Sequence, residues 1–165
     1  MRTRFLIVVP LIALATAGIA FGVTMLQSGE HFAGPDRSGI LTVGVDRLSV
    51  GTVETTIRPV AALHGATWPV LVVAESTSRY TAFLGRSPHL GCRVKWVKDP
   101  TYTRFSTNAE VAFEDPCGGA EFTIDGTCIA GPCNRGLDRF PIAVSHGDAH
   151  INLNVLNTGP TRAVP

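Results

Sequence analysis

The sequence lacks the common signatures of soluble enzymes and of nucleic-acid-binding proteins. No Gly-x-Ser-x-Gly elbow, phosphate-binding loop or zinc-protease helix motif occurs in its 165 residues. The formal net charge is only +1, and Lys and Arg are spread along the chain without forming a basic stripe, which argues against a nucleic-acid partner. We therefore expect a protein that is not catalytic alone and binds no nucleic acid.

Helical periodicity of useful length is absent after residue 27. Short segments with alternating polarity or β-branched residues take its place, and residues 68–74 form a nearly continuous apolar run that suits a buried strand. The expected strands lie in residues 40–45, 52–57, 68–74, 80–84, 110–113 and 121–126. This pattern predicts an all-β fold, a small antiparallel sandwich or barrel.

A final hairpin is expected from residues 140–145 and 149–155. The turn between them contains Gly147-Asp148, and a glycine in the first turn position favours a type II′ turn.

Charged residues are scarce, 16% of the chain, and none occurs in residues 5–26. A helix of about 20 apolar residues crosses a bilayer. Because Arg2 and Arg4 precede this run, we expect a single-pass anchor in the plasma membrane with the rest of the chain on the outer side, periplasmic or extracellular. The alternative is a cleaved secretory signal, since Ala15-Thr16-Ala17 fits a cleavage site. Both interpretations export the domain.

The composition divides the chain into four parts. Residues 1–27 form the anchor or signal, and residues 28–39, which contain Gly, Pro and charged residues, form a tether. Residues 40–156 form the β domain. Residues 157–165 form a tail that we expect to be flexible.

Three Pro/Gly-rich loops within the β domain carry cysteines. The first is Ser-Pro-His-Leu-Gly-Cys (residues 87–92), the second is Asp-Pro-Cys-Gly-Gly-Ala (residues 115–120), and the third begins Gly131-Pro132-Cys133. Their order resembles the Rieske iron-sulfur domain, whose loops read C-x-H-L-G-C, C-P-C-H-G and Gly-Pro. The resemblance covers residues 57–155 and implies stacked antiparallel sheets with a loop-rich cluster-type subdomain. It also implies a relation to the electron-transfer subunit of quinol:cytochrome c reductases, whose partners are cytochrome b or c type subunits.

In that family two cysteines and two histidines hold a 2Fe-2S cluster. At the matching positions only His89 keeps its ligand residue, and Ser87, Asp115 and Gly118 occupy the other three. A hydroxyl, a carboxylate and a glycine do not replace soft thiolates and an imidazole. We therefore expect no cofactor, and a degenerate domain with a structural or accessory role.

The chain has four cysteines, which allow three disulfide pairings. In an exported domain cysteines favour disulfides over metal binding. The resemblance implies a bridge between Cys92 and Cys117, because family members with this loop pair join the corresponding cysteines. Cys128 and Cys133 would then remain, and the segment between them can turn back to join them.

Several alternatives stay open at this point. His89, Ser87 and Asp115 could hold a single metal ion, or His89 could be hydrogen-bonded within its own loop. The domain could be an exported, disulfide-stabilised interaction module without redox function. It could also be a genuine iron-sulfur electron-transfer subunit with unusual ligands.

Overall fold

The computed structural model describes residues 38–98 and 111–162. Within these residues the chain forms antiparallel strands and one short 3₁₀ turn, η1 (Ala61–Leu63), so the all-β prediction is confirmed. The strands are β1 (Ile40–Gly44), β2 (Val53–Val60), β3 (Ala66–Ala74), β4 (Tyr80–Leu84), β5 (Lys95–Trp96), β6 (Phe113–Glu114), β7 (Glu121–Phe122), β8 (Cys128–Ala130), β9 (Arg139–Phe140), β10 (Ile142–Ser145) and β11 (Asp148–Asn152).

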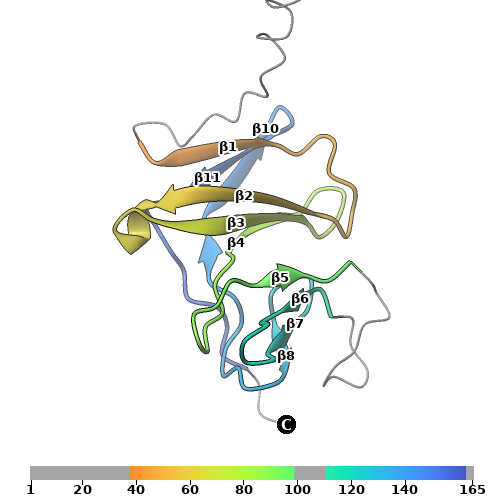
Figure 1. The fold of residues 1–165 in the computed structure, drawn as a ribbon. Helices are drawn as coiled ribbons and strands as arrows, with labels where there is room; N and C mark the ends of the chain where they lie inside the picture. The colour runs from red at the N-terminus through yellow and green to blue at the C-terminus, as the bar shows by residue number, and fades with distance from the viewer. Residues whose placement is uncertain (1–37, 99–110, 163–165) are drawn as a thin grey trace, which may run out of the picture. The chain divides into compact units, whose positions relative to one another are not determined.

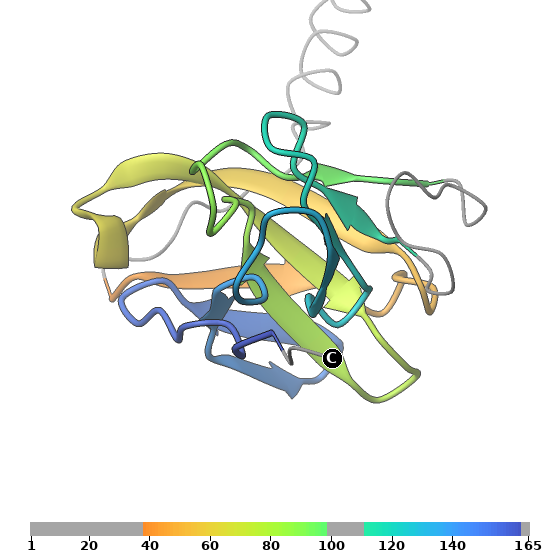
Figure 2. The same cartoon turned by 90° about the horizontal axis from the view of Figure 1, so that it is seen from below.

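The strands of the described residues form three sheets (Figure 1). We call them the outer sheet (β1-β11-β10), the middle sheet (β2-β3-β4-β9) and the loop sheet (β5-β6-β7-β8). In Figure 1 the middle sheet lies between the other two. Figure 2, seen from below, shows the loop sheet and its connections in front of the long strands of the middle sheet. The stacked arrangement follows from which faces of the middle sheet are apolar.

Strand β3 explains why the middle sheet is covered on both faces. Successive side chains of a strand point to opposite faces, so a continuous apolar run needs a cover on each side. Val70 and Val72 pack in the core cluster with the outer sheet, whereas Leu71 and Val73 pack in the cluster with the loop sheet. Each buried side chain of this size stabilises the fold by roughly 1.5–3 kcal/mol relative to an exposed one.

The loop sheet is formed by a segment inserted between two strands of the middle sheet. The chain leaves the middle sheet after β4 and returns to it at β9, and these two strands are antiparallel neighbours. Phe83 pairs with Arg139, and the Leu84 N–H donates to the Asp138 carbonyl at 2.9 Å. Residues 85–138 therefore start and finish at adjacent points of one sheet.

The loop sheet has shorter strands than the sequence pattern predicts. The apolar segments around Phe113 and Phe122 were expected to form longer strands, but β6 and β7 end as soon as their pairing ends. Thr123 and Asp125 then enter a turn closed by hydrogen bonds to Thr127. Side-chain bonds of this local kind compete with a continued ladder.

The final hairpin is confirmed, but the expected turn is wrong. Ser145 pairs with Asp148, so the two turn residues are His146 and Gly147. Their φ angles are 52° and 84°, and two positive values correspond to a type I′ rather than a type II′ turn. Histidine is among the residues that tolerate this left-handed backbone better than most.

The prediction of a flexible tail is wrong for residues 157–162, which are hydrogen-bonded to the β domain. Asn157 and Arg139 exchange two backbone hydrogen bonds, each of 2.8 Å. The guanidinium of Arg162 donates to the carbonyl of Gly131 at 2.9 Å. The end of the domain offers these residues backbone partners that the composition of the segment does not reveal.

The expected membrane anchor in residues 1–27 lies outside the described residues, as does most of the tether. Among residues 38–98 and 111–162, no helix has the length and hydrophobicity needed to cross a membrane.

Candidate functional site

Two of the loops singled out in the sequence close on themselves as compact turns. In the first loop the Ser87 N–H donates to the Cys92 carbonyl at 2.8 Å, and the Gly91 N–H donates back to Ser87 at 3.0 Å. The second loop connects β6 to β7, and the Asp115 N–H donates to the Ala120 carbonyl at 2.8 Å. Each loop therefore has a fixed backbone that can position side chains.

Ser87 and Asp115 meet in the interior between the two loops. The Ser87 hydroxyl donates to Asp115 Oδ2 at 2.6 Å, and the two residues are only 2% and 0% exposed. The second carboxylate oxygen, Oδ1, accepts the N–H groups of Cys117 and Gly118 at 2.9 and 3.2 Å. A buried carboxylate is costly unless its oxygens are hydrogen-bonded, and here both are.

The structure confirms both disulfides. Cys92 is bonded to Cys117, which joins the first loop to the second, with a Cα–Cα distance of 6.3 Å. Cys128 is bonded to Cys133, with a Cα–Cα distance of 6.1 Å. The second bridge links the end of the loop sheet to the residue that follows Gly131 and Pro132.

The third loop packs directly on the second. Gly131 has a φ of +74°, and a Cβ added there would lie 2.2 Å from the carbonyl oxygen of Gly119. Only glycine allows two backbones to approach this closely at a positive φ. Pro132, the next residue, is exposed, and Cys133 is buried.

The structure brings together all four positions that the resemblance assigns to cluster ligands. Ser87 and Asp115 are hydrogen-bonded, as described above. A Cβ added to Gly118 would lie 2.8 Å from Nδ1 of His89 and 3.1 Å from Oδ2 of Asp115. The first and second loops therefore present these four residues to one another.

His89 lies at the exposed edge of this group. Its backbone N–H donates to the Ser87 hydroxyl oxygen at 3.3 Å. Within residues 38–98 and 111–162 its ring makes no hydrogen bond, so the alternative of a His89 bonded within its own loop holds for the backbone N–H and not for the imidazole.

The donor set does not fit a 2Fe-2S cluster. A Rieske centre needs two thiolates and two imidazoles. The residues here offer one imidazole, one hydroxyl and one carboxylate, and the two oxygen donors are already bonded to each other.

The group of candidate metal ligands that the described residues bring together is Cys92, Asp115 and Cys117, and it does not include His89. The sulfur atoms of Cys92 and Cys117 lie within 4.8 Å of a carboxylate oxygen of Asp115. Both sulfurs belong to a disulfide and so cannot act as thiolate ligands.

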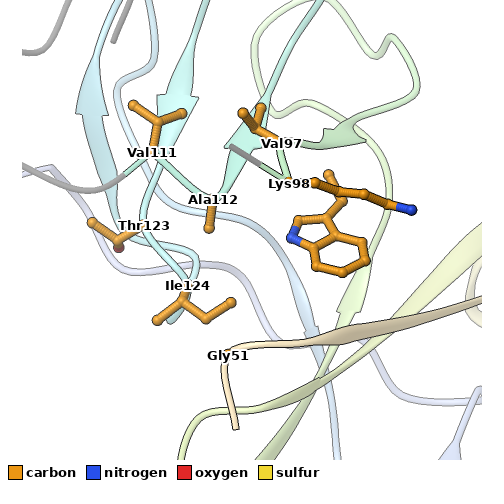
Figure 3. Close-up of a pocket in the computed structure, with 8 residues that line it drawn as sticks. Gly51, Val97, Lys98, Val111, Ala112, Thr123 and Ile124 are labelled. Atoms are coloured by element: carbon orange, nitrogen blue, oxygen red, sulfur yellow. The ribbon is translucent and has the colours of Figure 1, made fainter. Parts of the chain in front are cut away.

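A separate cavity of about 390 Å³ lies between the loop sheet and Gly51 (Figure 3). Figure 3 shows Val111, Ala112 and Ile124 around this space, with Lys98 across from them. Lys98 and Val111 adjoin positions 99–110, which lie outside the described residues.

The turn that follows β7 contains a carboxylate with a perturbed pKa. Partial burial alone would raise the pKa of Asp125, but hydrogen bonds from Thr123 and Thr127 and the positive charge of Arg139 outweigh it and lower the pKa. The Arg139 guanidinium also donates to the Asp125 carbonyl at 2.7 Å. These contacts connect the turn after β7 in the loop sheet to Arg139 in β9 of the middle sheet.

Arg86, Arg135 and Asp138 also lie beside the first loop, and no motif in the sequence indicates a role for them. Arg86 directly precedes the Ser-Pro-His motif, and that position was its only signal in the sequence. Arg135 and Asp138 come from the far side of the third loop, so only the fold brings them near Arg86.

Neither a comparison with protein-family models nor one with curated proteins found a match to this chain.

Proposed function

We propose that this chain is an exported Rieske-type domain protein, related to the electron-transfer subunits of quinol:cytochrome c reductases, with a structural or accessory role. One observation carries the proposal: positions 87, 89, 115 and 118 converge where two loops meet, and a disulfide joins the same two loops. The spacing in the sequence and the convergence in space support the same relation.

In this proposal the domain binds no 2Fe-2S cluster. A cluster would tie the two loops together through its ligands. Here the hydrogen bond between Ser87 and Asp115 and the bridge between Cys92 and Cys117 provide that tie instead. No electron transfer by this chain is therefore proposed.

Restoring the ligands tests both parts of the proposal. The triple variant Ser87→Cys, Asp115→Cys and Gly118→His carries the full family ligand set. The Cβ added at position 118 meets mainly the exposed ring of His89, which can move aside. After anaerobic reconstitution with iron and sulfide, we expect the triple variant, but not the wild type, to hold stoichiometric iron.

Electron paramagnetic resonance of the reduced proteins gives the deciding signal. A rhombic Rieske-like signal from the wild type would make electron transfer with unusual ligands the better function. A triple variant that folds, as judged by circular dichroism, but takes up no iron would weaken the relation to the family.

A second candidate is an exported interaction module without redox partners. The exposed surface of the loop pair favours it, because Leu90 is 59% exposed and follows the exposed His89 in the first loop, while Pro116 and Cys117 are exposed in the second. An exposed apolar side chain on a rigid loop suits contact with another protein. Purification in mild detergent separates the two candidates, since cytochrome b or c type subunits should accompany the chain only in the first.

The proposal includes a plasma-membrane location with the β domain on the outer side, through residues 1–27. The protein should then stay in the membrane fraction through alkaline washing, and protease added outside should reach the chain from Gln27 onward. A soluble product that begins near Gly18 would show a cleaved signal instead.

A further inference from the structure

A second, polar cavity lies beside the first loop, with a volume of about 260 Å³. Arg86 forms one part of its wall, and Arg135 with Asp138 forms another. The remaining lining residues are Ser87, Pro88, His89, Leu90 and Gly91.

Arg86 is held in place although its guanidinium is exposed. The guanidinium carbon lies 5.3 Å from the centre of the Trp68 ring, a cation–π contact. The group also lies against Gly91, where an added Cβ would be only 3.2 Å from Nε of Arg86. Two contacts from different segments therefore fix this charge at the wall of the cavity.

No carboxylate in residues 38–98 and 111–162 forms an ion pair with Arg86. The carboxylate of the cavity belongs to Asp138, and it is paired with the Arg135 guanidinium through two hydrogen bonds. Asp138 Oδ1 also accepts the Gly159 N–H at 3.1 Å. Among the described residues, the charge of Arg135 is thus balanced by a carboxylate, whereas the charge of Arg86 is not.

The Ser87 hydroxyl is committed to Asp115, so it offers the cavity no free proton. The His89 ring, in contrast, has no hydrogen-bond partner among the described residues. The cavity therefore presents one fixed, unbalanced guanidinium and one imidazole that can donate an N–H.

We propose that this cavity binds a small oxyanion, a phosphate or carboxylate group, with Arg86 as the main donor and His89 as a second donor. The planar guanidinium matches two oxygens of such a group at once. The volume lies just below the range of about 300–1,000 Å³ typical of larger organic ligands, so a small anion suits it best. This site does not depend on whether the loop pair once held a cluster.

Calorimetric titration of the full chain in non-ionic detergent with inorganic phosphate, at constant ionic strength set by chloride, tests the site. We expect saturable binding that Arg86→Gln weakens about tenfold or more, because one charge-assisted pair is lost. Lys98→Gln is the matched control, since the Lys98 ammonium also lies 5.3 Å from a Trp ring, that of Trp96, but lines the other cavity. This control should leave the affinity unchanged.

A parallel titration with acetate distinguishes the two oxyanions, and dependence on Arg86 in either titration supports the site. Absence of saturable binding for both anions would overturn the proposal, as would an equal loss of affinity in the two variants. If Arg86→Gln fails to fold, nuclear magnetic resonance of the wild-type protein still tests the proposed site. Its amide resonances for residues 87–91 should shift on addition of the anion that binds, and unmoved resonances would sink the assignment.

Discussion

The hydroxyl of Ser87 and the carboxylate of Asp115 are joined by a hydrogen bond of 2.6 Å between two almost completely buried residues. The residues come from different loops, so the bond connects the loops from the inside. Cys117, in the second loop, is exposed, so the disulfide to Cys92 connects the same loops nearer the surface. A buried hydrogen bond and a disulfide near the surface therefore both hold the first loop against the second.

Removing the hydroxyl should destabilise the fold. Ser87→Ala leaves Oδ2 of Asp115 buried without its partner, which costs about 1–3 kcal/mol of unfolding free energy. The control is Ser145→Ala, whose hydroxyl lies 3.2 Å from His150 Nε2 on an exposed strand, and it should change stability by no more than about 0.5 kcal/mol. Urea unfolding at pH 7 measures the unfolding free energy of both variants. An equal loss of unfolding free energy in the two would contradict a stabilising bond between Ser87 and Asp115.

The two disulfides should contribute unequally. The bridge between Cys92 and Cys117 spans a sequence separation of 25 and the bridge between Cys128 and Cys133 a separation of 5. Loop-closure entropy then predicts about 3.5 kcal/mol for the longer bridge and about 2 kcal/mol for the shorter.

Two double Cys→Ala variants, each keeping one bridge, allow the measurement. The difference in unfolding free energy between the oxidised and reduced forms of one variant isolates its remaining bridge, because the packing changes cancel. If the bridge between Cys128 and Cys133 contributed more unfolding free energy than the other, loop-closure entropy would not explain the relative contributions of the two disulfides.

Hydrophobic periodicity was sufficient to predict the long strands. The bounds of β4 agree with the alternating segment at residues 80–84, and the apolar run at residues 68–74 lies inside β3. These segments carry their burial pattern within their own sequence. The bridge between Cys92 and Cys117, which the resemblance implies, is likewise correct.

Features that depend on contacts between distant segments were not predicted. Strands β5 and β8 contain only two and three residues and exist because a neighbouring strand pairs with them. The bond between Ser87 and Asp115 and the cavity beside Arg86 likewise need the folded loops. No local pattern in the chain encodes such pairs.

Glycine at position 131 should be needed for space as well as for backbone conformation. Gly131 and Gly65 have similar φ angles, +74° and +77°, but an added Cβ meets the Gly119 oxygen at 2.2 Å in the first case and nothing within 4 Å in the second. Gly65→Ala should therefore cost about 1–2 kcal/mol for the left-handed backbone alone.

Gly131→Ala should cost at least about 1–3 kcal/mol more than Gly65→Ala, because the second loop must also move. Thermal and urea unfolding of the two variants give the comparison. A similar loss of unfolding free energy in the two variants would mean that the second and third loops can move apart without destabilising the fold.

The lowered pKa of Asp125 predicts a loss of stability in acid. The unfolded chain binds a proton at this carboxyl near its ordinary pKa of about 4, whereas the folded chain binds it only at lower pH. The stabilisation from Asp125 is thus present above about pH 4 and is lost as the pH falls through the lowered pKa.

Asp125→Asn keeps a hydrogen-bond acceptor but has no proton to bind. Urea midpoints measured from pH 5 downward should fall less steeply for this variant than for the wild type. Identical slopes would mean that Asp125 does not contribute to acid unfolding.

The adjacency of Leu84 and Asp138 has a consequence for how this domain can change over time. Residues 85–138 amount to an insertion in what would otherwise be a simple hairpin between β4 and β9. Deleting the insertion would leave Leu71, Val73 and Phe83 facing water, since the loop sheet is the cover of that face. Mutation can therefore change residues within this segment, but it cannot remove the segment without exposing that apolar face to water.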